Sequence, residues 1–217
     1  MIVVIDTATS QALVALGDAD GELRAATNWE AGYRHGETLL VTLQQLLADE
    51  GVALENLAGI VVGTGPGAFT GLRVGLATAK AIAHARALPI VGVSTAEALL
   101  DAAGRANRVL LLPAGPNDRT VVRAGQAPRL LPGGHEPDIA EGEQLVAVDL
   151  EGRAANDAVE AGQTARNGLA VALLRIGAAR LRSGDVDDLA RLVPEYVTLP
   201  RGVAAATGEV EWSRDPR

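Results

Sequence analysis

A glycine-rich segment, residues 63–75, constrains the fold of this chain more than any other feature. It follows the apolar run at residues 60–62 and leads into an alanine-rich helical pattern, so it is typical of a strand, a tight turn and a helix start. Glycine permits sharp turns, and the first amides of a helix have no partner within the helix. The segment predicts a βα corner. That corner can be simply a tight connection, an anion site at the helix N-terminus or a shaped contact surface.

The composition limits the kinds of chemistry open to the chain. Of 217 residues, 48% are hydrophobic and only 2% aromatic, so the core has to be built from aliphatic side chains. The chain has no cysteine, which excludes disulfides, thiolate metal ligands and a cysteine nucleophile. A formal net charge of −8 disfavours direct binding to a phosphate backbone. The first residues lack a basic region and no apolar run is long enough to span a membrane, so we expect a cytoplasmic protein.

Hydrophobic patterning predicts a mixed α/β fold. Strands are expected at residues 1–7, 11–17, 22–26, 59–63, 90–93, 109–112, 120–123, 129–131 and 145–149. Helices are expected at residues 36–50, 72–87, 95–103, 167–182 and 187–192, with Ser94 or Thr95 capping the third. An antiparallel start followed by alternating strands and helices indicates an α/β sheet. We expect an N-terminal lobe at residues 1–104, a smaller, degenerate α/β lobe at 105–201 and a flexible tail at 202–217.

Asp6, Thr7 and Thr9 follow the first predicted strand, where side-chain oxygens can serve phosphate chemistry. A carboxylate there can position a metal-bound water and hydroxyls can contact phosphate, although Asp and Thr are also ordinary turn residues. A nucleotide site would also need a second phosphate loop, and residues 133–135 are a poor candidate because they lack a clear strand-turn-helix setting. We therefore expect no catalytic residue and no cofactor in this chain, with these three residues as vestigial phosphate-loop candidates.

The histidines and serines do not form a recognisable catalytic or metal site. His35, His84 and His135 are not three or four residues apart, so no helix presents two imidazoles to one metal. None of the serines lies in a nucleophile-elbow pattern. We expect neither a metal site nor peptidase activity.

Two predicted helices have wide apolar faces. The first carries leucines at positions 39, 40, 43, 46 and 47, and the second combines Leu72 and Leu76 with alanines that allow close helix approach. Each face can be core or partner surface, and both interpretations can hold for different sides of one helix. A basic stripe on the second helix, with Arg73, Lys80 and His84, can be a solvated face or a contact patch for an acidic or RNA-bearing partner.

Four motifs, in order along the chain, resemble those of the TsaB (YeaZ) family. They lie at residues 1–9, 34–40, 63–75 and 89–95, and together they cover roughly the first half of the chain. The second half departs from the family pattern. An Asp-Ala-Arg-x-x-Glu-Val-Tyr segment is absent, and Thr198 stands where the family often has Arg after Pro194 and Tyr196.

The resemblance implies a two-lobed, ribonuclease H-like and actin-like (ASKHA) fold and a noncatalytic role. It implies that the chain binds TsaD, helps recruit the ATPase TsaE, and supports formation of N6-threonylcarbamoyladenosine beside the tRNA anticodon. ATP and metal would belong to partner subunits, tRNA would be reached only through the complex, and the chain alone could form a homodimer. TsaD carries a paired-histidine metal motif that this chain lacks.

The resemblance also implies which residues would contact a partner. These are His35, Glu37, Leu39, Leu40, Leu43, Leu47, Phe69, Leu72, Arg73, Leu76 and Lys80. The alternative from a different class is a small actin-like ATPase or phosphotransferase that uses the Asp6-Thr7 and Gly65–Gly71 loops.

Overall fold

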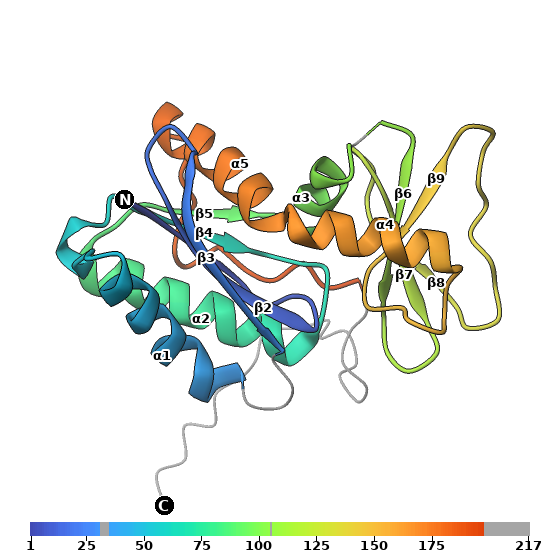
Figure 1. Cartoon of the computed structure of the whole chain (residues 1–217), viewed down its shortest axis with the longest axis horizontal. Coiled ribbons are helices and arrows are strands. Elements are labelled where there is room, and N and C mark those ends of the chain that lie inside the picture. The colour runs from blue at the N-terminus through green and yellow to red at the C-terminus, as the bar shows by residue number, and fades with distance from the viewer. Residues whose placement is uncertain (31–34, 105, 198–217) are drawn as a thin grey trace, which may run out of the picture.

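The chain folds into two mixed β-sheets that lie side by side and are joined by helices (Figure 1). The structure, a computed structural model, describes residues 1–30, 35–104 and 106–197, together with their side chains except those of residues 35–37. The predicted tail at residues 202–217 lies outside this range.

The first sheet has the strand order of a ribonuclease H-like lobe. Its strands are β1 (Ile2–Asp6), β2 (Gln11–Gly17), β3 (Leu23–Glu30), β4 (Gly59–Gly63) and β5 (Ile90–Val93). They lie in the order β3-β2-β1-β4-β5, with β1, β2 and β3 antiparallel and β4 and β5 parallel to β1. The predicted α/β class is confirmed.

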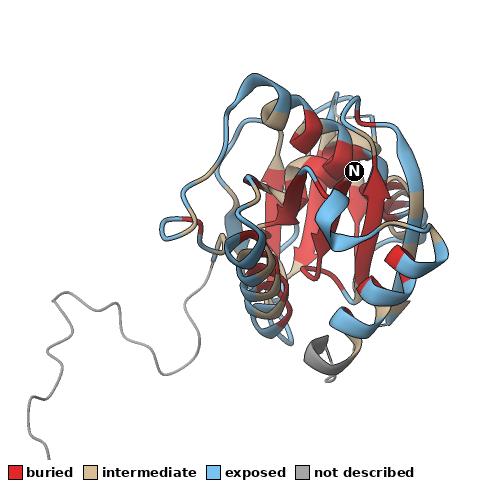
Figure 2. Cartoon of the chain, turned by 90° about the vertical axis from the view of Figure 1, so that its left-hand side faces the viewer, coloured by how far each residue is buried: buried red, intermediate tan, exposed pale blue. Residues whose placement is uncertain are grey.

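Helices cover both faces of the first sheet, which is why its central strands are apolar throughout. One face is covered by α1 (His35–Asp49) and α2 (Phe69–Arg86), and the other by α5 (Leu169–Ser183). Helix α3 (Thr95–Ala102) packs on α5 and on the second sheet, and the 3₁₀ turn Leu54–Asn56 precedes β4. Alternate residues of β1 divide between the faces: Val3 and Ile5 join the α1–α2 core, and Ile2 and Val4 the α5 core. Figure 2 shows these strands as a buried layer. No described helix is long and apolar enough to cross a membrane.

The second sheet repeats the start of the first with fewer strands. Its members are β6 (Arg108–Pro113), β7 (Arg119–Arg123), β8 (Arg129–Leu131) and β9 (Gln144–Ala147). The order is β8-β7-β6-β9, with β9 parallel to β6, which matches the order β3-β2-β1-β4. This is the smaller, degenerate second lobe that the family resemblance implies.

Two predictions for the last third of the chain fail. Helix α4 (Asn156–Asn167) packs on β9 but was not predicted, because its buried face is made of small residues, Ala158, Gly162 and Ala165, which give no apolar periodicity. Conversely, residues 187–192 do not form the predicted helix. They belong to an irregular segment, residues 184–197, that runs back along the first sheet.

That return changes how the lobes are divided. The Asp187 amide donates to the Ile90 carbonyl (2.9 Å), and the Glu195 amide to the Thr64 carbonyl (2.8 Å). Helix α5 packs on β4 and β5. The predicted boundary after residue 104 therefore separates the two sheets, but the segment 169–197, which we assigned to the second lobe, covers the first. One apolar core consequently runs through both lobes.

Candidate functional site

A cleft of about 660 Å³ lies between the two lobes, beside the glycine-rich turn. Three segments meet there: the β1–β2 turn, the start of α2 and the β6–β7 turn. Its lining residues are Ala8, Thr9, Ser10, Gly67, Ala68, Phe69, Leu112, Pro113, Ala114, Gly115, Pro116, Asp118 and Asp149. The cleft brings together the loops that the sequence singled out.

Asp6 lies beneath this cleft and does not line it. Its side chain is fully buried; one carboxylate oxygen accepts from the Thr95 hydroxyl (2.6 Å) and the other from the Ala8 amide (3.0 Å). Thr95 in turn accepts from the Gly65 amide (3.1 Å). Burial raises the pKa of Asp6 to about 6, against the lowering effect of the Thr95 and Ala8 hydrogen bonds, and the charge of Asp149 raises it slightly further.

The two threonine candidates are also engaged within the fold. The Thr7 hydroxyl donates to the Gly71 carbonyl in the first turn of α2 (2.7 Å), and the Thr9 hydroxyl donates to the Gln11 carbonyl (2.8 Å). Both residues are buried. The predicted phosphate-loop set thus ties the β1–β2 turn to α2, and only Thr9 touches the cleft.

Three glycines of the glycine-rich segment, residues 63–75, allow this close packing. A Cβ on Gly63 would lie 1.7 Å from an Asp6 carboxylate oxygen, one on Gly67 would lie 2.1 Å from the Ala8 carbonyl oxygen, and one on Gly75 would lie 2.1 Å from the Thr7 hydroxyl. Of the three interpretations of this segment, the tight βα corner is the one that these contacts explain directly.

Gly67→Ala should therefore weaken the fold at the cleft. The new methyl group meets backbone that cannot rotate away, so we expect a loss of about 2 kcal/mol in unfolding free energy, measured by urea denaturation. Gly133→Ala is the control, because a Cβ there would lie 3.0 Å from its nearest neighbour, the Asn117 Cβ. It should lower the unfolding free energy by well under half as much as Gly67→Ala does. Equal losses of unfolding free energy in the two variants would contradict this account of the glycine-rich segment.

The second-lobe side of the cleft is poorly suited to phosphate. The β6–β7 turn contains Pro113 and Pro116, which have no amide hydrogen, and its Ala114 amide already donates to the Asp118 carbonyl (3.0 Å). The cleft lining contains two carboxylates, Asp118 and Asp149, and no Lys or Arg. The loop at residues 133–135 does not line the cleft; Gly133 and Gly134 line an adjoining surface hollow that shares Pro116 and Asp118 with it.

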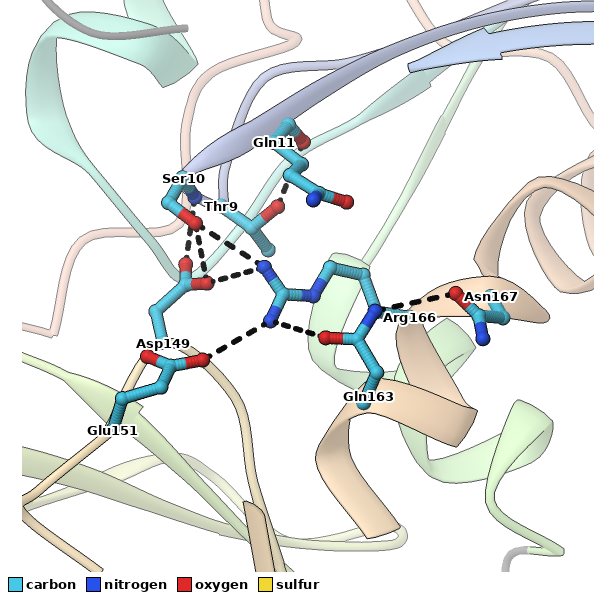
Figure 3. A network of polar contacts seen from close by, with 8 residues as sticks. All are labelled: Thr9, Ser10, Gln11, Asp149, Glu151, Gln163, Arg166 and Asn167. Atoms are coloured by element: carbon cyan, nitrogen blue, oxygen red, sulfur yellow. Dashed lines mark hydrogen bonds and ion pairs between the residues drawn. The ribbon is translucent and has the colours of Figure 1, made fainter. Parts of the chain in front are cut away.

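A buried ion pair joins the lobes at the back of the cleft (Figure 3). Arg166 of α4 donates to an Asp149 carboxylate oxygen (2.9 Å) and to the Ser10 hydroxyl (3.2 Å). Asp149 also accepts from the Ser10 amide and hydroxyl, both at 2.6 Å. The side chains of Arg166 and Asp149 are about nine-tenths buried. Because Ser10 belongs to the first lobe and the other two to the second, this network, which the sequence did not predict, fixes the lobes together.

The described residues contain no group of three or more potential metal ligands. His84 is exposed on α2 and His135 on the second lobe. The side chains of the candidates His35 and Glu37 lie outside the described part of the structure.

The burial of the apolar helix faces corrects part of the predicted partner surface. Five of its leucines lie in this chain's own core, each at most 6% exposed: Leu39, Leu43, Leu47, Leu72 and Leu76. The reason is that α1 and α2 pack directly on the first sheet, with Val14, Ile60 and Val62 among the residues of the shared core. Periodicity identifies an apolar face but cannot say whether it meets a sheet or another protein.

Other members of the predicted set are exposed. Leu40, Phe69 and Arg73 are on the surface, and α1 adds Val41, 64% exposed, which we had not predicted. Lys80 is half-buried because its ammonium group donates to the Leu192 carbonyl (3.1 Å). These residues, together with exposed Ala77, define the outer face of α1 and α2.

One end of this face is aromatic. Phe69 and Tyr196 are in contact, with ring centroids 5.0 Å apart, and the Arg73 guanidinium lies 4.9 Å from the Phe69 centroid. In a chain with five aromatic residues, two of them meet at the surface.

The two-sheet topology and interlobe cleft define a protein of the ribonuclease H-like, actin-like class. A family model described as "TsaD: tRNA N6-adenosine threonylcarbamoyltransferase" matches residues 29–200. The TsaB protein of Escherichia coli K12 is 37% identical over 107 residues, which cover 49% of this chain and 45% of that protein. TsaB of Haemophilus influenzae is 33% identical over 102 residues, covering 47% and 42%.

The structure of YeaZ from Pseudomonas aeruginosa has the same fold, with a TM-score of 0.71 at 21% identity, over 90% of this chain and 98% of that one. The chain belongs to this threonylcarbamoyltransferase-related family, as a member of its TsaB (YeaZ) group. It matches the curated TsaB relatives over a little less than half of their length.

Proposed function

We propose that this chain is a noncatalytic subunit in the biosynthesis of N6-threonylcarbamoyladenosine in tRNA. In this proposal it binds TsaD, holds it in a competent arrangement for threonylcarbamoyl transfer and helps recruit TsaE in the cytoplasm. ATP and metal are bound by the partner subunits, and tRNA is reached through the complex. The names of its TsaB relatives and the match to the TsaD family model support this pathway.

The hydrogen bonding of the buried Asp6 carboxylate is the observation that best supports a noncatalytic role. The one carboxylate that the resemblance places at a phosphate loop is sealed under the glycine turn and takes both of its hydrogen bonds from the fold. A group in that position stabilises the corner and has no path to a substrate in the cleft. The carboxylates and prolines that line the cleft favour the same interpretation.

The outer face of α1 and α2 is the proposed TsaD contact. It carries the exposed apolar side chains of Val41 on α1 and Ala77 on α2, and the exposed Phe69 with Arg73. Interfaces concentrate binding energy in aromatic and Arg residues surrounded by such apolar area. The buried leucines act behind this face by holding both helices on the sheet.

Val41→Asp should therefore weaken TsaD binding without unfolding the chain. A charge introduced on an apolar contact surface is desolvated on binding, so we expect at least about a tenfold rise in Kd, measured by calorimetry with the TsaD of the same cell. Leu43→Glu is unsuitable for this test because Leu43 is 2% exposed and the variant would lose its core.

Val171→Asp is the matched control for that experiment. It is also an exposed helical valine, 47% exposed, but it lies on α5 on the opposite face of the first sheet. It should leave TsaD binding within about twofold of the parent chain. Equal weakening by both variants, or by neither, would refute the assignment of this face.

The alternative function, a small actin-like ATPase or phosphotransferase, has one observation in its favour. The 660 Å³ cleft is large enough for a small ligand and adjoins the β1–β2 turn. This function predicts nucleotide binding by the isolated chain and loss of that binding in Asp6→Ala. Titration of the isolated chain with ATP and Mg²⁺ by calorimetry distinguishes the two, since the subunit role predicts no binding heat.

A further inference from the structure

A hollow of about 720 Å³ lies in the second lobe, where the β6–β7 turn meets the connection between β8 and β9. It is lined by two arginines, Arg119 and Arg153, by Asn117 and by two prolines, Pro116 and Pro132. Its volume is within the range of sites that hold small molecules. The proposed subunit role does not use this hollow.

Arg119, at the start of β7, is a buried cation whose carboxylate partner is exposed. The Arg119 side chain is 8% exposed, whereas that of Glu136 is 82% exposed. Each terminal nitrogen of Arg119 faces one Glu136 oxygen, at 3.5 and 3.3 Å. A carboxylate held tightly by a guanidinium in this two-pronged way lies at about 2.7–2.9 Å. The pair therefore has the arrangement of a carboxylate bound to arginine, but not its contact distances.

Two other arginine–carboxylate pairs of the second lobe are closer and better matched in exposure. Arg123 donates to both oxygens of Glu143, at 2.8 and 2.9 Å, and both side chains are 18% exposed. Arg166 and Asp149 are both about nine-tenths buried and lie 2.9 Å apart. An exposed side chain gains little from pairing, because solvent screens its charge and ordering it costs rotamer freedom. Unlike these two arginines, Arg119 thus lacks a tightly held anion.

The hollow offers further groups that suit an organic anion. Arg153 also lines it, and two backbone carbonyls of the β6–β7 turn accept from its guanidinium (3.5 and 3.0 Å). Asn117, exposed at the tip of the turn, adds a side-chain amide. Pro116 and Pro132 provide apolar surface for a carbon skeleton. A few polar groups among apolar ones are typical of a small-molecule site.

The charges of the lining favour a monoanion. With Glu136 in place, the lining has two cations, Arg119 and Arg153, and two carboxylates, those of Asp118 and Glu136. When Glu136 turns out into solvent, one positive charge is left in excess. A carboxylate balances that charge, whereas a phosphate dianion would leave the site with a negative charge. The two oxygens of a carboxylate also match the fork of a guanidinium.

We propose that this hollow binds a small molecule through its carboxylate group, which displaces Glu136 from Arg119. Glu136 serves as an internal substitute that pairs the buried guanidinium whenever no ligand does. The site lies in the second lobe, whereas the proposed TsaD contact lies on α1 and α2. The inference therefore does not depend on the subunit role, and each can fail without the other.

Titration of the ¹⁵N-labelled full chain with sodium acetate tests the site. Benzoate, inorganic phosphate and chloride are titrated in parallel at constant ionic strength and pH 7.5, and the readout is the NMR shifts of the Arg119 and Arg153 side-chain N–H groups. We expect saturable shifts with acetate, a lower Kd for benzoate because its ring can pack on the prolines, and weaker binding of phosphate and chloride. Phosphate that binds more tightly than acetate, or arginine signals that do not respond to acetate, would overturn the proposal.

Glu136→Gln distinguishes a binding site from an ion pair that only stabilises the loop. Glutamine has the shape of glutamate but no charge, so acetate no longer competes with an internal carboxylate for Arg119. Acetate should therefore bind at least about fivefold more tightly to this variant than to the parent chain. A purely structural pair predicts no gain in affinity, so an unchanged or higher Kd would overturn the proposal.

Glu141→Gln is the matched control, because it removes the same charge from an exposed position in the same connection between β8 and β9. Glu141 does not line the hollow, so the Kd for acetate should stay within about twofold of the parent value. Equal tightening by Glu136→Gln and Glu141→Gln would show that acetate responds only to net charge, and would overturn the proposal.

Arg119→Lys tests the contribution of the guanidinium fork. Lysine keeps the positive charge but cannot bind both oxygens of a carboxylate in one plane, so the Kd for acetate should rise at least about fivefold. An unchanged Kd in a folded Arg119→Lys chain would overturn the proposal. Because Arg119 is buried, the amide spectrum reports whether this variant folds, and the comparison of Glu136→Gln with Glu141→Gln decides the proposal if it does not.

Discussion

Arg166→Met should destabilise the protein by about 3 kcal/mol, because it leaves the buried Asp149 carboxylate without its cation. Methionine keeps most of the apolar stem of Arg166, so the loss reports the charge and its hydrogen bonds to Asp149 and Ser10. The measurement is the free energy of unfolding in urea at pH 7.5. The same variant should loosen the lobes, since this network ties the β1–β2 turn to the second sheet.

Arg175→Met is the control for that measurement. Arg175 also pairs with a carboxylate, that of Asp101, but its side chain is 57% exposed, so solvent screens the pair. Arg175→Met should lower the free energy of unfolding by less than about 1 kcal/mol. If the two variants lower the free energy of unfolding equally, burial does not explain the contribution of the Arg166–Asp149 pair to stability.

The second large effect is a dependence on pH that Asp6 creates. Its pKa is raised from 3.8 to about 6 by burial, so the folded state binds this proton more tightly than the unfolded state. The stabilising contribution is therefore fully present below about pH 4, falls as the pH rises to about 6, and is lost above it. The difference of about two pKa units corresponds to about 3 kcal/mol.

Asp6→Asn removes this titration. Because asparagine changes the hydrogen bonds to Thr95 and Ala8 as well, the prediction concerns the change with pH. The stability of the parent chain relative to Asp6→Asn should fall by about 2 kcal/mol between pH 4 and pH 7. Urea unfolding of both chains over this range gives the difference and cancels the titration of groups that they share, such as Glu143. A constant difference across the range would show that Asp6 is not held in this buried environment.

The first lobe could be predicted from the sequence because its signals are local. Apolar runs bounded by glycine or acidic residues mark β1 and β4, and the leucines of α1 recur at helical spacing. What the sequence could not reveal is what these leucines contact. Leu43 and Leu40 belong to one apolar pattern, yet Leu43 is buried against the sheet and Leu40 is 48% exposed.

The second lobe and the interlobe contacts depend on pairings far apart in the chain. Ser10 and Asp149 are 139 residues apart, and no local motif marks either of them. Helix α4 buries alanine and glycine, so it has no apolar stripe, and the β6–β7 turn is not glycine-rich, since its one glycine, Gly115, lies between Pro113 and Pro116. Asp6, Thr7 and Thr9 lie at the end of β1 and in the turn after it, and their packing role emerges only from the glycine contacts around them.

The most direct test of the subunit role is threonylcarbamoyl transfer to tRNA by the TsaD and TsaE of the same cell, measured with this chain, without it, and with Asp6→Asn in its place. We predict that transfer requires the chain and that Asp6→Asn supports it as well as the parent chain does, because Asp6 contacts only the fold. Transfer that proceeds equally without the chain, or that is lost with an Asp6→Asn chain that still binds TsaD, would contradict the noncatalytic subunit role.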